Sequence, residues 1–217
     1  MDFEINRIQV RKNNRAKNLR LAVDKHGRPV LTIPFLCPKW YALRWAEKQK
    51  GWIEKNTFTP NNFAPEQNIS IGDKIYKLKH NPQQKNNIVG KTEIIIGGDL
   101  CFFNRRVRDL IKKEFLSLLQ KQIPLYAQKL GVKYHRITLR DTSSRWGSCS
   151  ARGNLNFCWR IALAPEFVIH YLIAHEVSHL KYMNHSASFW KTVTTLTPDT
   201  TRAKNWLKHH ARQLQIG

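Results

Sequence analysis

The chain has 217 residues, of which 41% are hydrophobic and 11% aromatic, so it can bury a sizeable core and cannot be disordered as a whole. Thirty-seven Lys and Arg residues outnumber fifteen Asp and Glu residues, and the net charge of +22 favours anionic partners such as nucleic acid, anionic lipid or acidic proteins. No apolar stretch approaches the ~20 residues of a membrane span, and no secretory leader is visible. We therefore expect a cytoplasmic protein whose four cysteines stay reduced.

The first hundred residues are expected to be mainly β with one helix. Alternating apolar residues predict strands over 3–10, 19–23, 30–33, 69–78 and 88–96, with turns at 26–29 and 72–73. Pro38 opens a predicted helix that runs to about residue 55.

The second half is expected to be mainly helical. Apolar residues recur at helical spacing from Phe103 to Leu130, where Gly131 is a plausible cap, and Pro124 should kink or split this helix. Beyond it the sequence predicts two short strands and three helices, over residues 136–140, 154–159, 165–183, 186–196 and 200–213.

One motif carries chemistry. His175-Glu176-Val177-Ser178-His179 is an HExxH sequence inside the predicted helix over 165–183. Two His at positions i and i+4 share one helix face, so both imidazoles can reach one ion, while Glu176 can reach a metal-bound water without being a ligand. The motif therefore predicts a zinc-dependent hydrolase.

A catalytic zinc site needs a third protein ligand. His185 follows His179 by six residues, and on a continuous helix it would lie about 9 Å further along the axis. Asn184 could end the helix and let the chain bring His185 back to the ion. This HExxHxxxxxH spacing matches the metzincins, but Tyr182 stands where they carry Gly and no later Met-turn is identifiable.

Several segments together resemble the YgjP-like metallopeptidases, which are relatives of the SprT-like and gluzincin-type zinc peptidases. They are the RWGSCS sequence over 145–150, GNLN over 153–156, Ala164-Pro165, the HExxH helix, Asn184-His185-Ser186 and Phe189-Trp190. The resemblance is densest over 136–210. The family usually has Asp-Tyr where this chain has His170-Tyr171, and we interpret His170 as a non-ligand because it projects elsewhere on the helix.

The resemblance implies one Zn²⁺ ion held by His175, His179 and His185, with Glu176 as the catalytic glutamate and a polypeptide as substrate. It also implies an α+β fold, in which a mainly β region (residues 1–100) packs on a zincin-like domain (residues 101–217) with a small sheet. The expected reaction is peptide hydrolysis by a zinc-activated water, with Glu176 as general base and then general acid.

Arg145 to Ser150 could form an exposed strand or loop beside the zinc that pairs with an extended substrate, or Trp146 could belong to the core and Gly147 to a bulge. The candidate substrate-binding residues are Arg145, Trp146, Gly147, Ser148, Asn156 and Tyr182. The candidates for stabilising the oxyanion are Tyr171, Tyr182, Arg145 and Asn156. We interpret Cys149 as a small buried hydrophobe, and Phe189 and Trp190 as packing that fixes His185.

A rival interpretation is a basic nucleic-acid-binding protein whose zinc is structural. The charge of +22 supports it, and the basic and aromatic residues over 39–55 could bind single strands. Structural zinc sites are usually closed by four ligands rich in Cys, which disfavours it. A peptidase recruited to DNA or RNA by its charge combines the two, by analogy with SprT-like relatives that act on proteins crosslinked to DNA.

Overall fold

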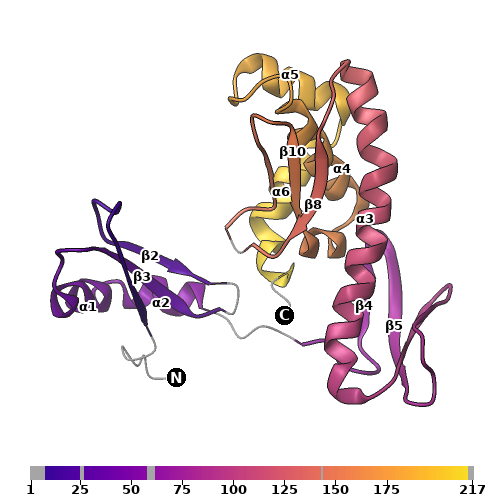
Figure 1. The fold of residues 1–217 in the computed structure, drawn as a ribbon, viewed down its shortest axis with the longest axis horizontal. Coiled ribbons are helices and arrows are strands. Elements are labelled where there is room, and N and C mark those ends of the chain that lie inside the picture. Colours follow the sequence, from indigo (N-terminus) through magenta and orange to yellow (C-terminus); the bar gives the residue numbers. More distant parts are fainter. Residues whose placement is uncertain (1–7, 25–26, 58–61, 143, 215–217) are drawn as a thin grey trace. The chain divides into compact units, whose positions relative to one another are not determined.

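A computed structural model describes residues 8–24, 27–57, 62–142 and 144–214. The chain divides into two compact units, residues 1–61 and residues 62–216 (Figure 1). The division falls earlier than the boundary after residue 100 that the sequence suggested.

The first unit is a three-stranded sheet with two helices on one of its faces. Its strands, in the order β1-β3-β2, are β1 (Gln9–Asn13), β2 (Arg20–Val23) and β3 (Pro29–Pro34). Strand β3 pairs in parallel with β1 and antiparallel with β2. The helices α1 (Lys39–Glu47) and α2 (Lys50–Asn56) bury Ala42, Ala46 and Ile53 against Leu31 and Ile33 of β3.

Two predictions for this unit need correction. The single helix expected over 38–55 is two helices, because the Gln49 amide donates to the Ala46 carbonyl at 2.9 Å and the helical path breaks there. Residues 3–7 of the strand expected over 3–10 lie outside the described residues, and the strand that is described runs over Gln9–Asn13.

The second unit begins with a four-stranded sheet in the order β4-β5-β7-β6. Its strands are β4 (Asn68–Ile71), β5 (Lys74–Asn81), β6 (Ile88–Val89) and β7 (Glu93–Gly97). Leu78, Ile94 and Ile96 from this sheet share one core with Val107 and Ile111 of the long helix α3 (Phe103–Leu130). This shared core is why the sheet belongs to the second unit and not to an N-terminal β domain.

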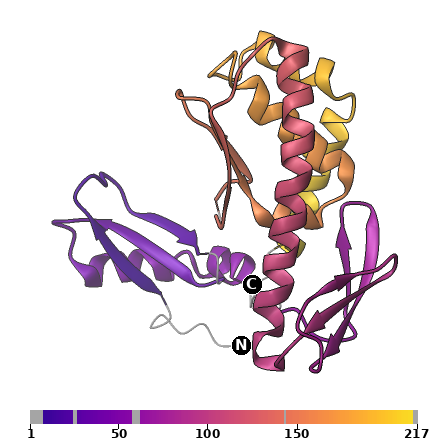
Figure 2. The same ribbon diagram turned by 45° about the vertical axis from the view of Figure 1, so that its right-hand side comes forward.

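Helix α3 runs the length of the second unit, with the four-stranded sheet beside its N-terminal half (Figures 1 and 2). Pro124 lies inside one continuous helix of 28 residues, so the expected split does not occur. Gly131 ends the helix in the left-handed conformation, at φ 64°, as the sequence predicted. A 3₁₀ turn over Leu100–Phe102 precedes the helix.

The C-terminal half of α3 packs beside a small sheet and three more helices. The sheet, in the order β8-β10-β9, contains β8 (Arg136–Arg140), β9 (Gly147–Cys149) and β10 (Asn154–Cys158). A 3₁₀ segment (Trp159–Leu163) leads into α4 (Glu166–Ser178), α5 (Ala187–Leu196) and α6 (Thr200–His210), and a last 3₁₀ turn covers Ala211–Leu214. The predicted α+β class is confirmed. Within the described residues, no helix is long and apolar enough to cross a membrane.

Candidate metal centre

Helix α4 is the central element of the site. It is almost fully enclosed by protein, and its buried residues include Val168, Leu172, Ile173 and Val177. His175 and His179 lie one turn apart, with their Nε2 atoms 3.3 Å from each other. The one-turn spacing that the motif predicted is therefore present, at the point where the helix leaves the core.

The chain turns immediately after this pair and returns a third imidazole. Helix α4 ends at Ser178, and the amides of Lys181 and Tyr182 both donate to the Ser178 carbonyl. The helix is thus shorter than the predicted 165–183, but the predicted return is present. Nε2 of His185 lies 3.2 Å from Nε2 of His175.

Aromatic side chains fix the third histidine. Ser186 caps α5 by accepting a hydrogen bond from the Phe189 amide at 3.3 Å, which sets the start of that helix. The fully buried Phe189 ring lies 4.5–5.0 Å from the rings of all three histidines, measured between centroids. Trp190 stacks on His185 at 5.7 Å. The interpretation of both residues as packing around His185 is confirmed.

Two of the three imidazoles are shifted toward the neutral form that binds a metal. Burial, followed by the neighbouring His179 and His185, lowers the pKa of His175 to about 3, and burial also lowers the pKa of His179. Nδ1 of His179 lies 3.0 Å from the Tyr182 carbonyl and can donate only from a protonated nitrogen, which leaves a lone pair on Nε2.

One ligand atom from each histidine fits within a span of 4.8 Å. Neutral nitrogen acceptors crowded in this way repel one another unless a cation lies between them. The donor set therefore fits a zinc ion, which prefers imidazole nitrogen.

Glu176 lies on the same helix and is only 3% exposed. Its Oε2 has no hydrogen-bond partner among the described residues. Burial raises the pKa of Glu176 to about 8, and the positive charge of Arg145 acts in the opposite direction. A cation held by the three histidines would lower this pKa further and stabilise the carboxylate.

Gly147 of β9 makes room for this carboxyl group. A Cβ atom at position 147 would come within 2.7 Å of Cγ and Cδ of Glu176, and nearer still to Oε1. No side chain larger than that of glycine fits there unless Glu176 moves. The sequence suggested that Gly147 belongs either to a bulge or to a substrate-binding strand. The structure adds the close approach of Gly147 to Glu176, which lies about thirty residues further along the chain.

Comparison with known proteins agrees with this geometry. The family model described as YgjP-like, metallopeptidase domain matches residues 17–210. The chain belongs to the YgjP-like metallopeptidase family. Membership makes it a metallopeptidase with a polypeptide substrate, and a metal, usually zinc, is implied.

One solved structure is similar to part of this YgjP-like chain. It is the crystal structure of the metallopeptidase zymogen of Pyrococcus abyssi abylysin. The match has a TM-score of 0.39 and 23% sequence identity, and it covers 46% of this chain and 97% of the other. No curated protein matches the sequence significantly.

Five of the six predicted substrate residues line one small cavity, and one of them, Gly147, lies against Glu176. The five that line this cavity of about 270 Å³ in the YgjP-like domain are Arg145, Trp146, Gly147, Ser148 and Asn156. Asn156 lies opposite Ser148 in the β10–β9 pairing and donates to its Oγ at 3.3 Å. The sixth, Tyr182, does not line this cavity, and its backbone carbonyl holds His179.

Two further interpretations can be compared with the structure. Nδ1 of His170 lies 3.0 Å from the Tyr126 hydroxyl on α3, which places this imidazole in a different contact from the metal cluster. Cys149 is half-buried and packs against the main core, as expected of a small hydrophobe. Burial and the nearby Glu176 raise the pKa of its thiol to about 11, so the reactive thiolate is disfavoured.

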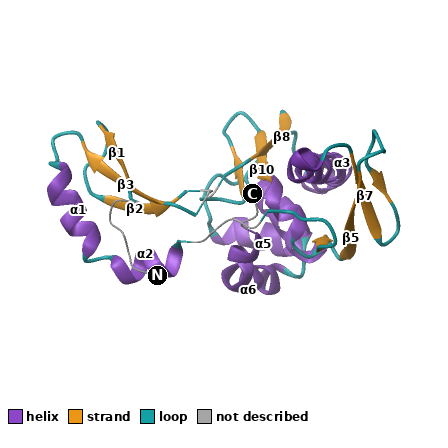
Figure 3. Ribbon diagram, turned by 90° about the horizontal axis from the view of Figure 1, so that it is seen from below, coloured by secondary structure: helices purple, strands orange, loops and turns teal. Residues whose placement is uncertain are grey.

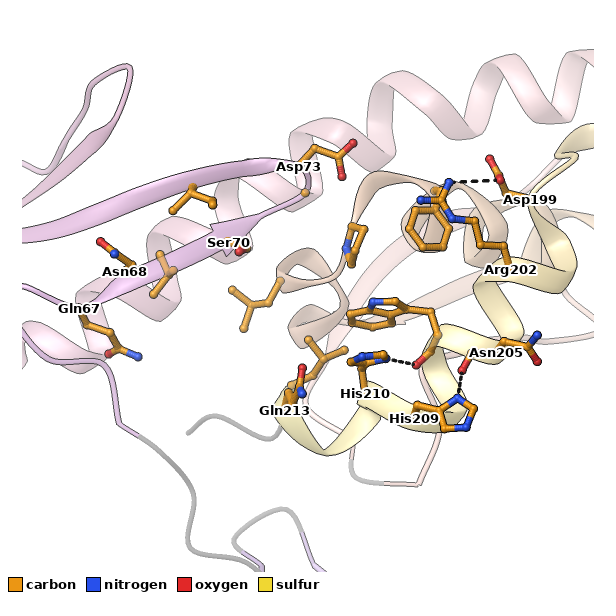
Figure 4. Close-up of a pocket in the computed structure, with 18 residues that line it drawn as sticks. Gln67, Asn68, Ser70, Asp73, Asp199, Arg202, Asn205, His209, His210 and Gln213 are labelled. Carbon is orange, nitrogen blue, oxygen red and sulfur yellow. Dashed lines mark hydrogen bonds and ion pairs between the residues drawn. The ribbon is translucent and has the colours of Figure 1, made fainter.

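A much larger groove lies elsewhere in the second unit (Figure 4). Its volume is about 1180 Å³, and it is bounded by β4, the start of α4 and helix α6. None of the residues predicted for the site lines it. Its two histidines are engaged locally, since Nδ1 of His209 lies 2.8 Å from the Asn205 carbonyl and Nδ1 of His210 lies 3.0 Å from that of Trp206.

Proposed function

We propose that this protein is a zinc-dependent peptidase in which His175, His179 and His185 hold one Zn²⁺ ion. In this proposal Glu176 transfers a proton from the attacking water to the leaving amine. The observation that carries the proposal is the convergence of three imidazoles, together with a buried carboxyl group that lacks a partner among the described residues. Structural zinc sites are usually closed by four ligands. The described residues supply three here, which favours the open coordination of a catalytic site.

Zinc, when bound, supplies a Lewis acid that polarises the peptide carbonyl and lowers the pKa of water to about 7. The protein's own contribution to the reaction is Glu176. Its carboxylate accepts a proton from the attacking water and delivers it to the leaving amine nitrogen, so one residue acts first as base and then as acid. Its burial shields both transfers from bulk water.

Strand β9 is the proposed docking edge for the substrate. It is the outer strand of the β8-β10-β9 sheet, and Gly147 within it contacts Glu176. An extended polypeptide added to this edge would lie alongside the catalytic glutamate, with its side chains over the cavity that Arg145, Ser148 and Asn156 line. Trp146 packs partly against the core, which anchors the strand that the substrate would meet.

Stabilisation of the negative charge on the carbonyl oxygen falls to polar groups around Glu176. Arg145 is exposed and close enough to affect the charge of Glu176, and Asn156 faces the same cavity. Tyr171 is buried, and burial together with Glu176 raises its pKa to about 12, which keeps its hydroxyl protonated as a donor. Tyr182 remains a fourth candidate.

The deciding experiment compares Glu176→Gln with the wild type on an unfolded, labelled protein substrate, both loaded with zinc. We expect the variant to bind zinc equally well and to lose cleavage by about 10²–10⁴-fold, the usual contribution of a general acid–base. Zinc content is measured alongside the rate. Retained cleavage in a zinc-loaded variant would refute the role of Glu176.

The four cysteines are consistent with a reducing compartment. Cys37, Cys101, Cys149 and Cys158 all carry free thiols, as is usual for cytosolic proteins. We therefore place the reaction in the cytoplasm, and thiol labelling of protein taken directly from cells would test this placement.

A further inference from the structure

The first unit carries a segment of unusually uniform charge. Residues 9–23 contain no Asp or Glu, and they contain five cationic residues, called here the basic strand surface: Arg11, Lys12, Arg15, Lys17 and Arg20. All five are exposed. Among the described residues, none of the five forms an ion pair with a carboxylate.

The sheet sets the direction in which part of this charge points. Arg11 of β1 and Arg20 of β2 both lie opposite Thr32 of β3, so these three residues form one row across the sheet. Residues that are paired across strands share a face, and neighbours along a strand point to opposite faces. Leu31 and Ile33, which flank Thr32, are fully buried against the helices. The arginine row therefore lies on the face away from α1 and α2, both of which are on one side of the sheet (Figure 3).

Polar amide side chains surround the cations. Gln9, Asn13, Asn14 and Asn18 are all exposed in the same segment. The side chain of Asn13 accepts a hydrogen bond from the Arg15 amide at 2.8 Å, which shapes the turn after β1. Gln9 accepts one from the Arg11 guanidinium at 2.9 Å. Guanidinium and amide groups are the side chains that contact phosphates and base edges.

We propose that the basic strand surface binds the backbone of double-stranded nucleic acid. The proposal goes beyond the peptidase activity and rests on different residues in a different unit. Arg11, Arg15, Lys17 and Arg20 together match the dense and regular charge of a duplex. Lys12 pairs with Ile33 and points to the other face of the sheet, so it is not counted among the contacts.

Residues 9–23 themselves lack what a membrane or a single strand would need. An interfacial membrane site requires exposed apolar anchors, but Val10, Leu19 and Leu21 of this segment pack against the core. Single strands are held by aromatic stacking, and residues 9–23 contain no aromatic side chain. The exposed rings of Trp40 and Tyr41 belong to α1, in the helical layer on the other side of the sheet.

Phe35 and Leu36, just after β3, are exposed, and the Phe35 ring lies 5.4 Å from Nζ of Lys12. Lys12 pairs with Ile33, which faces the helices, so this contact is not on the face that carries Arg11 and Arg20.

The test measures binding of the full-length protein to a labelled 20-base-pair duplex by fluorescence anisotropy between 50 and 200 mM KCl. If four cations each neutralise one phosphate, the affinity should fall by about 100-fold over this range, with a log–log slope near −3.6. The variant Arg11→Gln/Arg15→Gln/Lys17→Gln/Arg20→Gln should lose most of the affinity at 50 mM and most of the salt dependence.

A matched variant separates this surface from net charge. Lys39→Gln/Arg44→Gln/Lys48→Gln/Lys55→Gln removes the same four charges from exposed positions on and beside α1 and α2. It should bind duplex within threefold of the wild type. Equal loss in both variants, or no duplex binding by the wild type at 50 mM, would overturn the proposal.

Two more controls complete the test. Tighter binding to phosphatidylserine vesicles than to duplex would assign the surface to membranes and would also overturn the proposal. Glu176→Gln should bind duplex normally, and the basic-surface variant should still cleave peptide. These two variants therefore distinguish a failure of the peptidase proposal from a failure of the nucleic-acid proposal.

Discussion

The two cavities of the second unit differ in size and in chemistry. The groove between β4 and α6 has a volume of about 1180 Å³, whereas the cavity along β9 has about 270 Å³. The smaller one is lined by Gly147, against which the buried Glu176 packs, and Glu176 follows His175, one of three convergent imidazoles, in the chain. Within the described residues, no other group of three metal-ligating side chains converges in this way.

The polar side chains of the groove are occupied locally. Arg202 lies over the Phe167 ring at 3.9 Å and within 3.6 Å of Asp199, and His210 stacks on Trp206 at 4.9 Å. Each contact holds a side chain in place, and none directs several donors to one point. The two cavities therefore differ in chemistry as well as in volume, and the convergence of polar groups favours the smaller one as the reactive site.

Removing one metal ligand should lower zinc affinity far more than removing a histidine from the large groove. His185→Ala should lower zinc affinity by more than about 100-fold, because even residues that only support ligands cost 10–100-fold. His185 is exposed, so its truncation leaves no cavity in the core. Competition with a chromophoric zinc chelator measures the affinity.

His209→Ala is the matched control for this prediction. It removes an equally exposed imidazole from the groove and should leave zinc affinity and cleavage unchanged. If the two variants lost zinc to the same extent, the assignment of His185 would be wrong.

A single methyl group added beside Glu176 should lower kcat without removing the metal. Gly147→Ala must displace Glu176, and a misplacement of about 1 Å can reduce the rate by about 100-fold. We expect zinc binding to persist while kcat falls. Full activity of Gly147→Ala would show that the carboxyl group can move freely.

Gly51→Ala is the control for Gly147→Ala. Its new Cβ meets nothing within 4 Å, and Gly51 lies in helix α2. Alanine there should raise the free energy of unfolding by about 0.4–1 kcal/mol, because it restricts the unfolded chain, and should leave kcat unchanged.

Weakening the aromatic packing around the histidines should have a moderate effect on stability and on zinc affinity. Phe189→Leu creates a cavity beneath the three rings and should lower the free energy of unfolding by about 1–2 kcal/mol. Looser histidines should also weaken zinc binding by about tenfold. Phe102→Leu, at a ring that is 44% exposed, should change the free energy of unfolding by less than about 0.5 kcal/mol. Equal destabilisation by the two variants would contradict this role of Phe189.

The smallest effect is expected in the large groove. Ile75 lines it and is 66% exposed. Ile75→Ser should change neither kcat nor KM by more than about twofold, and stability should stay within about 0.5 kcal/mol. A large rise in KM would show instead that the groove takes part in substrate binding.

Local signals along the chain predicted much of the fold. The strand over 136–140, the Gly131 cap and the helix that Ser186 caps are all present, and the strand expected over 154–159 runs over Asn154–Cys158. Each depends on alternation, on a left-handed position or on a capping side chain, which are properties of a few neighbouring residues. Local signals failed at the expected split at Pro124 and at the uninterrupted helix over 38–55. In α3, packing of the apolar face outweighs the hydrogen bond that proline removes.

The amino-acid sequence alone carries the HExxH spacing of His175 and His179, the glutamate between them, the third histidine six residues on, and a strongly basic composition. Four further features are visible only in the folded chain: the end of α4, the close approach of Gly147 to Glu176, the core that the β4–β7 sheet shares with α3, and the face of the first sheet that carries Arg11 and Arg20. The two sets of features differ in how far along the chain the underlying interactions act. Spacing and capping act within about one helical turn, whereas close approach and burial join residues that are distant along the chain and have no signature in the residues between them.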